Sequence, residues 1–512
     1  MNRLAVAVPL GALALLGTGT AYAHGFGERY DLPIPLSFFM AGAAAAVAFS
    51  FVVIGLFVQR HPGELSYPRY NLLVRPRLGA ALASRLWLTP VRVLSVVLLA
   101  LVLVTALFGT NKPIENLSPT FVWIIWWVGM GYVAALLGNL WAVVNPWKIT
   151  FEWGERLLGE GGDGRDGMFA YPERWSGWPA VVLFLVFAWL ENVYTGASTP
   201  SKLGLLILAY SVVTWGGMAA FGKHRWLSHG EAFWVLFGLF SRFSPTEVRV
   251  PDTRVCRGCE LECEPTGGGC VDCYACFERA GIEGRERELN LRPYAVGLAR
   301  PGDVSTATAV FVLLTLSTVA FDGLTATSVW LDFQNAIYPT ATWLGADTAG
   351  AISTMGLVLL PVVLLSVYLA FSWAIQRLSG EESGVPAVAR AFVFSLVPIA
   401  LAYNMAHFIS LLAIQGQYII PLASDPFGVG WDLLGTAGYR VNIALVNAKF
   451  VWFVAVVAIV LGHIASVYIA HVISMGRVAD RSRALRGQYP MLLLMVFYTA
   501  TSLWIIAQPI VS

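Results

Sequence analysis

The sequence predicts an all-α integral membrane protein that crosses the bilayer about ten times. Of the 512 residues, 57% are hydrophobic and only 12% are charged, against roughly 25% charged residues in a soluble domain. The apolar residues form runs long enough to cross about 30 Å of hydrocarbon. All six cysteines, by contrast, fall in one short polar segment. A chain of this composition needs lipid as part of its solvent, and we expect one metal-binding or cluster-binding module on its surface.

The first segment, residues 1–23, is predicted to be a cleaved signal peptide. Arg3 precedes the apolar run 4–16, and Ala21-Tyr22-Ala23 provides a cleavage site of the small-x-small type. An uncleaved first span is the alternative interpretation. Cleavage would make His24 the first residue, whose free amine and ring nitrogen could together bind a metal such as copper.

Ten apolar runs follow the predicted signal peptide. They cover residues 35–58, 88–108, 121–144, 179–194, 203–221, 306–324, 352–375, 388–414, 448–473 and 489–510. The long polar segment 222–305 separates a first membrane half, residues 24–221, from a second, residues 306–512, with five spans in each. Within this segment, the apolar stretch 233–243 is too short to cross the bilayer, and we expect it to lie along the interface.

Two independent signals predict the orientation of the spans. A signal peptide places the mature N-terminus outside, and arginines concentrate in the loops that the span count then assigns to the cytoplasm. These loops are 59–87, 145–178, 222–305, 376–387 and 474–488. We therefore predict a multi-pass protein with both termini outside. The net charge of only +2, without any basic run, argues against nucleic acid as a partner.

The cysteines form two arms within the predicted cytoplasmic loop. The first arm is Cys256-x2-Cys259-x3-Cys263, and the second is Cys270-x2-Cys273-x2-Cys276. Thiolates two or three residues apart can turn onto one cation, and the intervening glycines 267–269 let the arms fold together. All six cysteines are therefore candidate ligands.

Four interpretations of this module remain open. We favour a structural zinc site that takes four of the six thiolates, for instance Cys256, Cys259, Cys273 and Cys276. An iron–sulfur cluster would use the second arm with a fourth ligand from the first. A disulfide framework is disfavoured because the cytoplasm is reducing. A redox dithiol is the remaining possibility.

Ionisable residues inside the spans are candidates for function because burying them in a bilayer costs free energy. Glu191, Asp322 and His407 lie near the outer ends of their spans, and with His24 they are expected to line one pocket open to the outside. We predict Glu191, Asp322 and His407 as catalytic residues, with His24 and His407 as ligands of zinc or copper, since such a donor set supports metal-assisted hydrolysis. Structural hydrogen bonds between helices are the alternative role.

Three stretches carry a resemblance to a known family. They are the sequence His-Gly-Phe-Gly-Glu-Arg-Tyr-Asp-Leu-Pro-Ile-Pro from His24, Tyr403-Asn404-x2-His407 with Gln415-Gly-Gln417, and Leu461-Gly-His463 through Ala470-His471. The chain resembles bacterial integral membrane proteins named fenitrothion hydrolases, over most of its membrane part but not over the cysteine module.

This resemblance implies hydrolysis of an organophosphorothioate triester, a small-molecule substrate, in a bacterial inner membrane. It also implies a second membrane subunit as partner, and it supplies no catalytic residues of its own. No soluble-hydrolase motif accompanies it, neither a Gly-x-Ser-x-Gly elbow nor a phosphate-binding glycine loop. The rival hypothesis is a metal-handling or electron-transfer membrane protein with a cytoplasmic zinc or iron–sulfur module.

Overall fold

The structure is a computed structural model that describes residues 32–58, 67–74, 85–159, 167–257, 259, 269–282, 284–299 and 304–511. Three predicted features lie outside these ranges: the signal peptide, the proposed ligand His24, and Cys263 of the first cysteine arm.

Helices dominate the described ranges, and nine of them are long and apolar enough to cross a membrane. The uninterrupted ones are α2 (Leu36–Phe57), α4 (Arg85–Phe108), α10 (Pro200–Phe221), α15 (Thr306–Thr325), α17 (Thr348–Ser379), α21 (Ala448–Arg477) and α22 (Arg481–Val511). Two spans are composite. One joins α5 (Leu117–Thr120), a π-helical segment (Phe121–Val128) and α6 (Gly129–Leu136), and the other joins α18 (Val385–Phe392), α19 (Val397–Ile414) and α20 (Ile419–Ser424).

The prediction of a polytopic all-α protein is thus confirmed, but one of the ten expected spans is short. The run 179–194 forms α9 (Trp178–Asn192), whose 15 residues extend about 22 Å, less than the thickness of the hydrocarbon core. The other short helices are α7 (Trp141–Val144), α8 (Pro146–Leu157), α11 (Lys223–His229), α12 (Ala232–Ser241), α13 (Thr253–Arg257), α14 (Tyr274–Ile282) and α16 (Ser328–Ala341).

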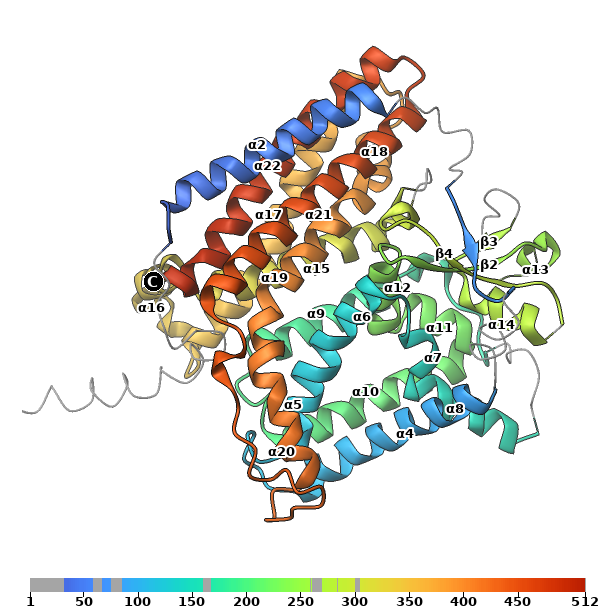
Figure 1. The fold of residues 1–512 in the computed structure, drawn as a ribbon, viewed down its shortest axis with the longest axis vertical. Coiled ribbons are helices and arrows are strands. Elements are labelled where there is room, and N and C mark those ends of the chain that lie inside the picture. The colour runs from blue at the N-terminus through green and yellow to red at the C-terminus, as the bar shows by residue number, and fades with distance from the viewer. Residues whose placement is uncertain are drawn as a thin grey trace, which may run out of the picture.

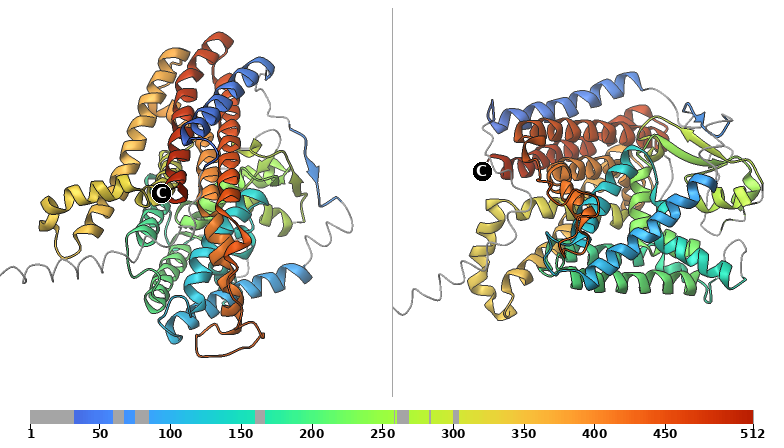
Figure 2. Two further views of the ribbon diagram at one scale, coloured as in Figure 1. Left: turned by 60° about the vertical axis from the view of Figure 1, so that its left-hand side comes forward. Right: turned by 60° about the horizontal axis from the view of Figure 1, so that its bottom comes forward.

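The long helices form two groups (Figures 1 and 2). In one group, α2 packs against α21 and α22, and α17 also packs against α22. In the other, α4 packs against α10 and α8, while α12 packs against α6 and α9. Helices α9, α15 and α19 join the groups. The first described helix therefore lies among the C-terminal helices rather than beside its neighbours in sequence.

The outer faces of several long helices carry exposed apolar side chains. Phe49 of α2, Leu94 of α4 and Val363 of α17 are each more than half exposed. Inside the bundle, by contrast, Trp452, Phe184 and Phe311 are fully buried. Apolar surface in such amounts is stable against lipid rather than water, which agrees with the membrane class predicted from composition.

The stretch 233–243 was expected to lie along the membrane interface, and this expectation is wrong. In the structure it forms most of α12, with Phe233, Leu236 and Phe237 at most 3% exposed and packed in the main core. The physical reason is that this helix is apolar on all sides, which favours burial, whereas an interfacial helix needs one polar face.

A small antiparallel sheet lies at one end of the helices. Its strand order is β1 (Tyr70–Asn71), β4 (Glu288–Leu291), β2 (Thr246–Val250) and β3 (Cys270–Val271). The register pairs Val250 with Cys270, so the end of β2 lies beside the second cysteine arm. We call this end of the molecule, which carries the cysteines, the sheet end.

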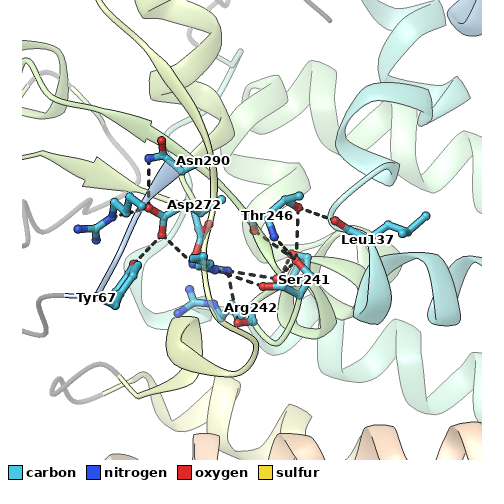
Figure 3. A network of polar contacts seen from close by, with 12 residues as sticks. Tyr67, Leu137, Ser241, Arg242, Thr246, Asp272 and Asn290 are labelled. Atoms are coloured by element: carbon cyan, nitrogen blue, oxygen red, sulfur yellow. Dashed lines mark hydrogen bonds and ion pairs between the residues drawn. The ribbon is translucent and has the colours of Figure 1, made fainter. Parts of the chain in front are cut away.

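A buried arginine fastens the sheet to the end of α12, within the polar network that includes Asp272, Ser241 and Arg242 (Figure 3). The Arg292 guanidinium donates to Glu247 at 3.1 Å and to Asp272 at 2.9 Å, and it also donates to the backbone carbonyls of Ser241 and Arg242. Because the side chains of Arg292 and Glu247 are completely buried, the ion pair fixes the sheet at one position. Loss of Arg292 would leave Glu247 paired with Arg69 alone, and loss of Glu247 would leave Arg292 paired with Asp272 alone.

Candidate functional site

Three predicted catalytic residues come from three helices. His407 of α19 places its Nε2 atom 2.8 Å from Oδ2 of Asp322 in α15. Glu191, near the end of α9, accepts a hydrogen bond of 2.6 Å from the indole nitrogen of Trp127. The carboxylates of Glu191 and Asp322 are close enough to interact electrostatically. The structure thus brings His407, Asp322 and Glu191 together, and we call these three residues the acid–base cluster.

Local sequence explains the placement of Asp322 and His407. Asp322 follows more than four turns of α15 in which the side chains are almost all apolar or small, roughly 24 Å from Thr306. An isolated carboxylate there is costly unless it is paired, and His407 is its partner. The start of α15 follows the sheet in the chain, so the acid–base cluster lies at the opposite end of this helix from the sheet end.

Tyr403 completes the surroundings of His407, and sequence reasoning named it only as part of a motif. The spacing of four residues in a helix puts both rings on one face, and their centroids are 6.0 Å apart with an angle of 13° between the planes. The Tyr403 hydroxyl has no hydrogen-bond partner in the described part of the chain. The signal available in the sequence was the spacing Tyr403-x3-His407.

The described donors of the acid–base cluster do not by themselves form a metal site. Among the described residues, only cysteines bring three metal-binding atoms within 4.8 Å of one another. The Nε2 atom of His407 is hydrogen-bonded directly to Asp322, where a metal ion would have to insert. A zinc or copper centre needs at least three protein ligands, and the further predicted ligand, His24, lies outside the described residues.

What the pair can do without a metal is acid–base chemistry. A carboxylate that accepts a hydrogen bond from one imidazole nitrogen fixes the ring orientation and stabilises its protonated form. The other ring nitrogen can then take a proton from a nucleophile. His407 and Asp322 have the composition and contact of such a pair.

The five described cysteines gather at the sheet end. The Sγ atoms of Cys259 and Cys273 are 3.9 Å apart, and those of Cys270 and Cys276 are 3.6 Å apart. Two groups of three donors share Cys276, which therefore lies between the two arms. Both arms converge as the sequence predicted.

The structure joins Cys256 and Cys270 in a disulfide, whereas the sequence interpretation disfavoured disulfides in this segment. The register of the sheet explains the contact, because Cys270 pairs with Val250 and Cys256 lies in α13, directly after that strand. Cys259, Cys273 and Cys276 remain outside the disulfide.

The cysteine donor set fits a zinc-sized ion when the thiols are reduced. Four sulfurs at about 2.3 Å from a tetrahedral zinc are roughly 3.8 Å apart, close to the two separations of 3.6 and 3.9 Å. An iron–sulfur cluster places several iron and sulfide atoms between the cysteines and requires wider spacing. The ion would be held by Cys259, Cys273 and Cys276 together with one sulfur of the Cys256–Cys270 pair.

A buried charge network connects the cysteine cluster to the membrane helices. Glu278 of α14 forms an ion pair with Lys148 of α8, and Lys148 also lies 3.6 Å from Glu152. Glu152 further contacts Lys223 and Arg92. Burial by itself would raise the pKa of Glu152, but these three cations lower it to about 2.

Sequence reasoning missed Glu231, a fully buried carboxylate between α11 and α12. It caps α12 by accepting hydrogen bonds from the backbone of Phe233 at 3.0 Å and Trp234 at 2.6 Å. The Tyr210 hydroxyl, at the middle of α10, also donates to it. The start of α12 therefore lies level with the middle of a long helix. An acidic residue directly before an apolar run was the available signal for this cap.

Two other intramembrane histidines lie apart from the acid–base cluster and have structural partners. His463 contacts the carbonyl of Ile459 at 2.8 Å through Nδ1. His471 lies between the side chain of Gln488 and the carbonyl of Val58, each at 3.0 Å, and so joins α21, α22 and the end of α2.

Comparison of the chain with protein-family models, with curated proteins and with solved structures finds no match.

Proposed function

We propose that the chain is a membrane-embedded hydrolase in which His407, oriented by Asp322, is the general base that activates water toward a phosphotriester. The observation that supports this most is the 2.8 Å contact between His407 Nε2 and Asp322 Oδ2. Both side chains lie inside a helix bundle, where an unpaired carboxylate would be expensive. The resemblance to fenitrothion hydrolases suggests a triester of this class, either a phosphotriester or a phosphorothioate, as substrate.

In this mechanism each residue has a distinct role. Asp322 holds the imidazole through Nε2, and Nδ1 takes a proton from the attacking water. The water oxygen forms a bond to phosphorus while the bond to the aryloxy group breaks, and the aryloxide leaves with the electron pair. Glu191 supplies an ionisable carboxyl near the imidazolium that forms. These steps use only the described side chains of His407, Asp322 and Glu191.

We further place the acid–base cluster toward the outside and the cysteine cluster in the cytoplasm. The arginine-rich loops and the predicted signal peptide support this orientation. About 24 Å of α15 separates Asp322 from the start of the helix, so the cysteines do not touch the reacting atoms. A zinc ion there would stabilise the sheet end rather than take part in the outer chemistry.

The test is hydrolysis of an aryl dialkyl phosphotriester by the full chain purified in detergent. We expect His407→Gln and Asp322→Asn each to lower kcat/KM by about 100-fold or more, the usual range for loss of a general base. Both variants should still insert and purify in normal amounts. Full activity in either variant would remove the pair from the mechanism.

A second candidate function is favoured by the cysteine cluster itself. Converging thiols within 4.8 Å of one another are also what a metal-handling or electron-transfer protein requires. Metal analysis and an absorption spectrum of anaerobically purified protein separate the two candidates. A reducible chromophore, or metal flux into vesicles without phosphotriester hydrolysis, would favour this second function.

A further inference from the structure

The side chain of Tyr403 is only 2% exposed, yet its hydroxyl has no hydrogen-bond partner in the described chain. Buried polar atoms are almost always hydrogen-bonded, because leaving one unsatisfied carries the full cost of removing it from water. A phenylalanine would fill the same space without this cost. The hydroxyl therefore calls for an explanation other than packing.

The hydroxyl points toward the acid–base cluster. A Cβ atom on Gly323 would lie only 2.3 Å from the Tyr403 oxygen, so the hydroxyl approaches the backbone directly beside Asp322. It is close enough to Asp322 to interact with its charge, although it makes no hydrogen bond to that carboxylate. The ring lies nearly parallel to that of His407. Only a glycine at position 323 leaves room for this arrangement.

We propose that the Tyr403 hydroxyl donates a hydrogen bond to the phosphoryl oxygen of the substrate. The inference rests on the proposed function and deepens it by adding a catalytic residue. Negative charge grows on that oxygen when water attacks phosphorus, and a fixed donor there stabilises the transition state more than the ground state. Tyr403 and His407, one turn apart, then act on the same phosphorus centre.

A hydroxyl donor also selects between two substrate classes. Oxygen is a strong hydrogen-bond acceptor, whereas sulfur is a weak one. The ratio of kcat/KM for a P=O ester to kcat/KM for its P=S analogue should therefore exceed the ratio of the uncatalysed hydrolysis rates of the same two esters. The preferred substrate is then an oxygen phosphotriester rather than the phosphorothioate that the resemblance implies.

The experiment compares Tyr403→Phe with wild type on a matched pair of aryl dialkyl esters, one P=O and one P=S. We expect kcat/KM for the P=O ester to fall about 100-fold, as for loss of one oxyanion donor, with the change mainly in kcat. The kcat/KM for the P=S ester should fall much less. The ratio of kcat/KM for the P=O ester to kcat/KM for the P=S ester should therefore decrease strongly. The different intrinsic reactivities of the two esters cancel, because the kcat/KM of the variant is divided by that of wild type for the same ester.

Tyr498→Phe is the matched control, because Tyr498 is also a buried tyrosine whose hydroxyl has no partner among the described residues. It lies in α22, two turns before Ile505, the residue of that helix that approaches Gly323. We expect this variant to leave both esters unaffected. Neither substitution should lower Tm, since each removes an unsatisfied hydroxyl.

The outcomes separate the two proposals. If wild type hydrolyses the P=O ester and depends on His407, but Tyr403→Phe keeps the wild-type ratio, this inference alone is wrong. If wild type hydrolyses neither ester, the proposed function and this inference both fall. Gly323→Ala provides a second variant, because the added methyl group would displace the hydroxyl and should reduce the ratio in the same direction.

Discussion

Glu278, which follows Cys276 by two residues in α14, forms an ion pair with the buried Lys148 of α8. The helix that carries the shared cysteine is therefore anchored directly to α8, which packs against the membrane-spanning helix α4. Lys148 continues the connection to Glu152, which also contacts Lys223. Order at the cysteine cluster and packing of the membrane helices should depend on each other through this network.

The first prediction concerns Cys273→Ser. If a zinc ion holds the cysteine cluster, this change removes one ligand, and binding free energy that supports folding is lost with it. We expect less folded protein in the membrane and less than one zinc per chain by elemental analysis, about one being expected for wild type.

Glu278→Gln is the comparison variant for Cys273→Ser. It keeps all thiols and should retain zinc, but it weakens the anchor to Lys148 and so lowers Tm. Should Cys273→Ser accumulate normally and yet lose all activity, the cluster would be catalytic or redox-active, and its assembly role would be wrong.

The second prediction concerns acid sensitivity through Glu152. Its pKa in the folded chain is lowered to about 2, below the unfolded value near 4.5, so the ionised form stabilises the fold. This contribution, on the order of 3 kcal/mol, is complete above about pH 5 and is lost as pH falls toward 2. Unfolding followed by circular dichroism in detergent should show Tm falling through this window.

Glu152→Gln provides the check on this assignment. It leaves Lys148, Lys223 and Arg92 without their shared anion, so the variant should be less stable at pH 7 and should show a smaller fall in Tm below pH 5. A variant with wild-type stability and an unchanged acid profile would show that another group governs the transition.

The third prediction concerns the cap of α12. Glu231→Ala removes the acceptor of two backbone amides and of the Tyr210 hydroxyl, all in a region without access to water. Each buried donor left unsatisfied costs about 1–3 kcal/mol, so the variant should be strongly destabilised. Glu173→Ala is the control, because Glu173 also lies at a helix start but is exposed. Equal thermal stability of the two variants would contradict the structural role of Glu231.

The sequence predicted the long helices because apolar runs of this length have few other stable structures. It also predicted that Asp322, Glu191 and His407 would meet, since all three lie at similar depth near the ends of their spans. It did not predict the position of α2 or the burial of α12. Both depend on contacts between residues far apart in the chain, such as His471 with Val58 and Glu231 with Tyr210, which local patterns do not encode.

The last prediction concerns Glu191, the third member of the acid–base cluster. Glu191→Gln preserves the size of the side chain and an oxygen that accepts from the Trp127 indole, but it removes the ionisable carboxyl. Because an ionisable carboxyl close to Asp322 can respond to the imidazolium that forms on His407, its loss should lower kcat while KM changes little. We expect a decrease of about 10- to 100-fold, within the range for one electrostatic contribution in a water-poor site.

Trp127→Phe is the matched variant for Glu191→Gln, because it removes the hydrogen bond to Glu191 and leaves the ionisable carboxyl in place. It should reduce kcat less than Glu191→Gln, because the carboxyl can still ionise. An equal or larger decrease would show that the orientation of the carboxyl group matters more than its ionisation. Phosphotriester hydrolysis at the wild-type rate in both variants would exclude Glu191 from the reaction. The acid–base cluster would then reduce to the pair of His407 and Asp322, whose 2.8 Å contact needs no third residue to orient the base.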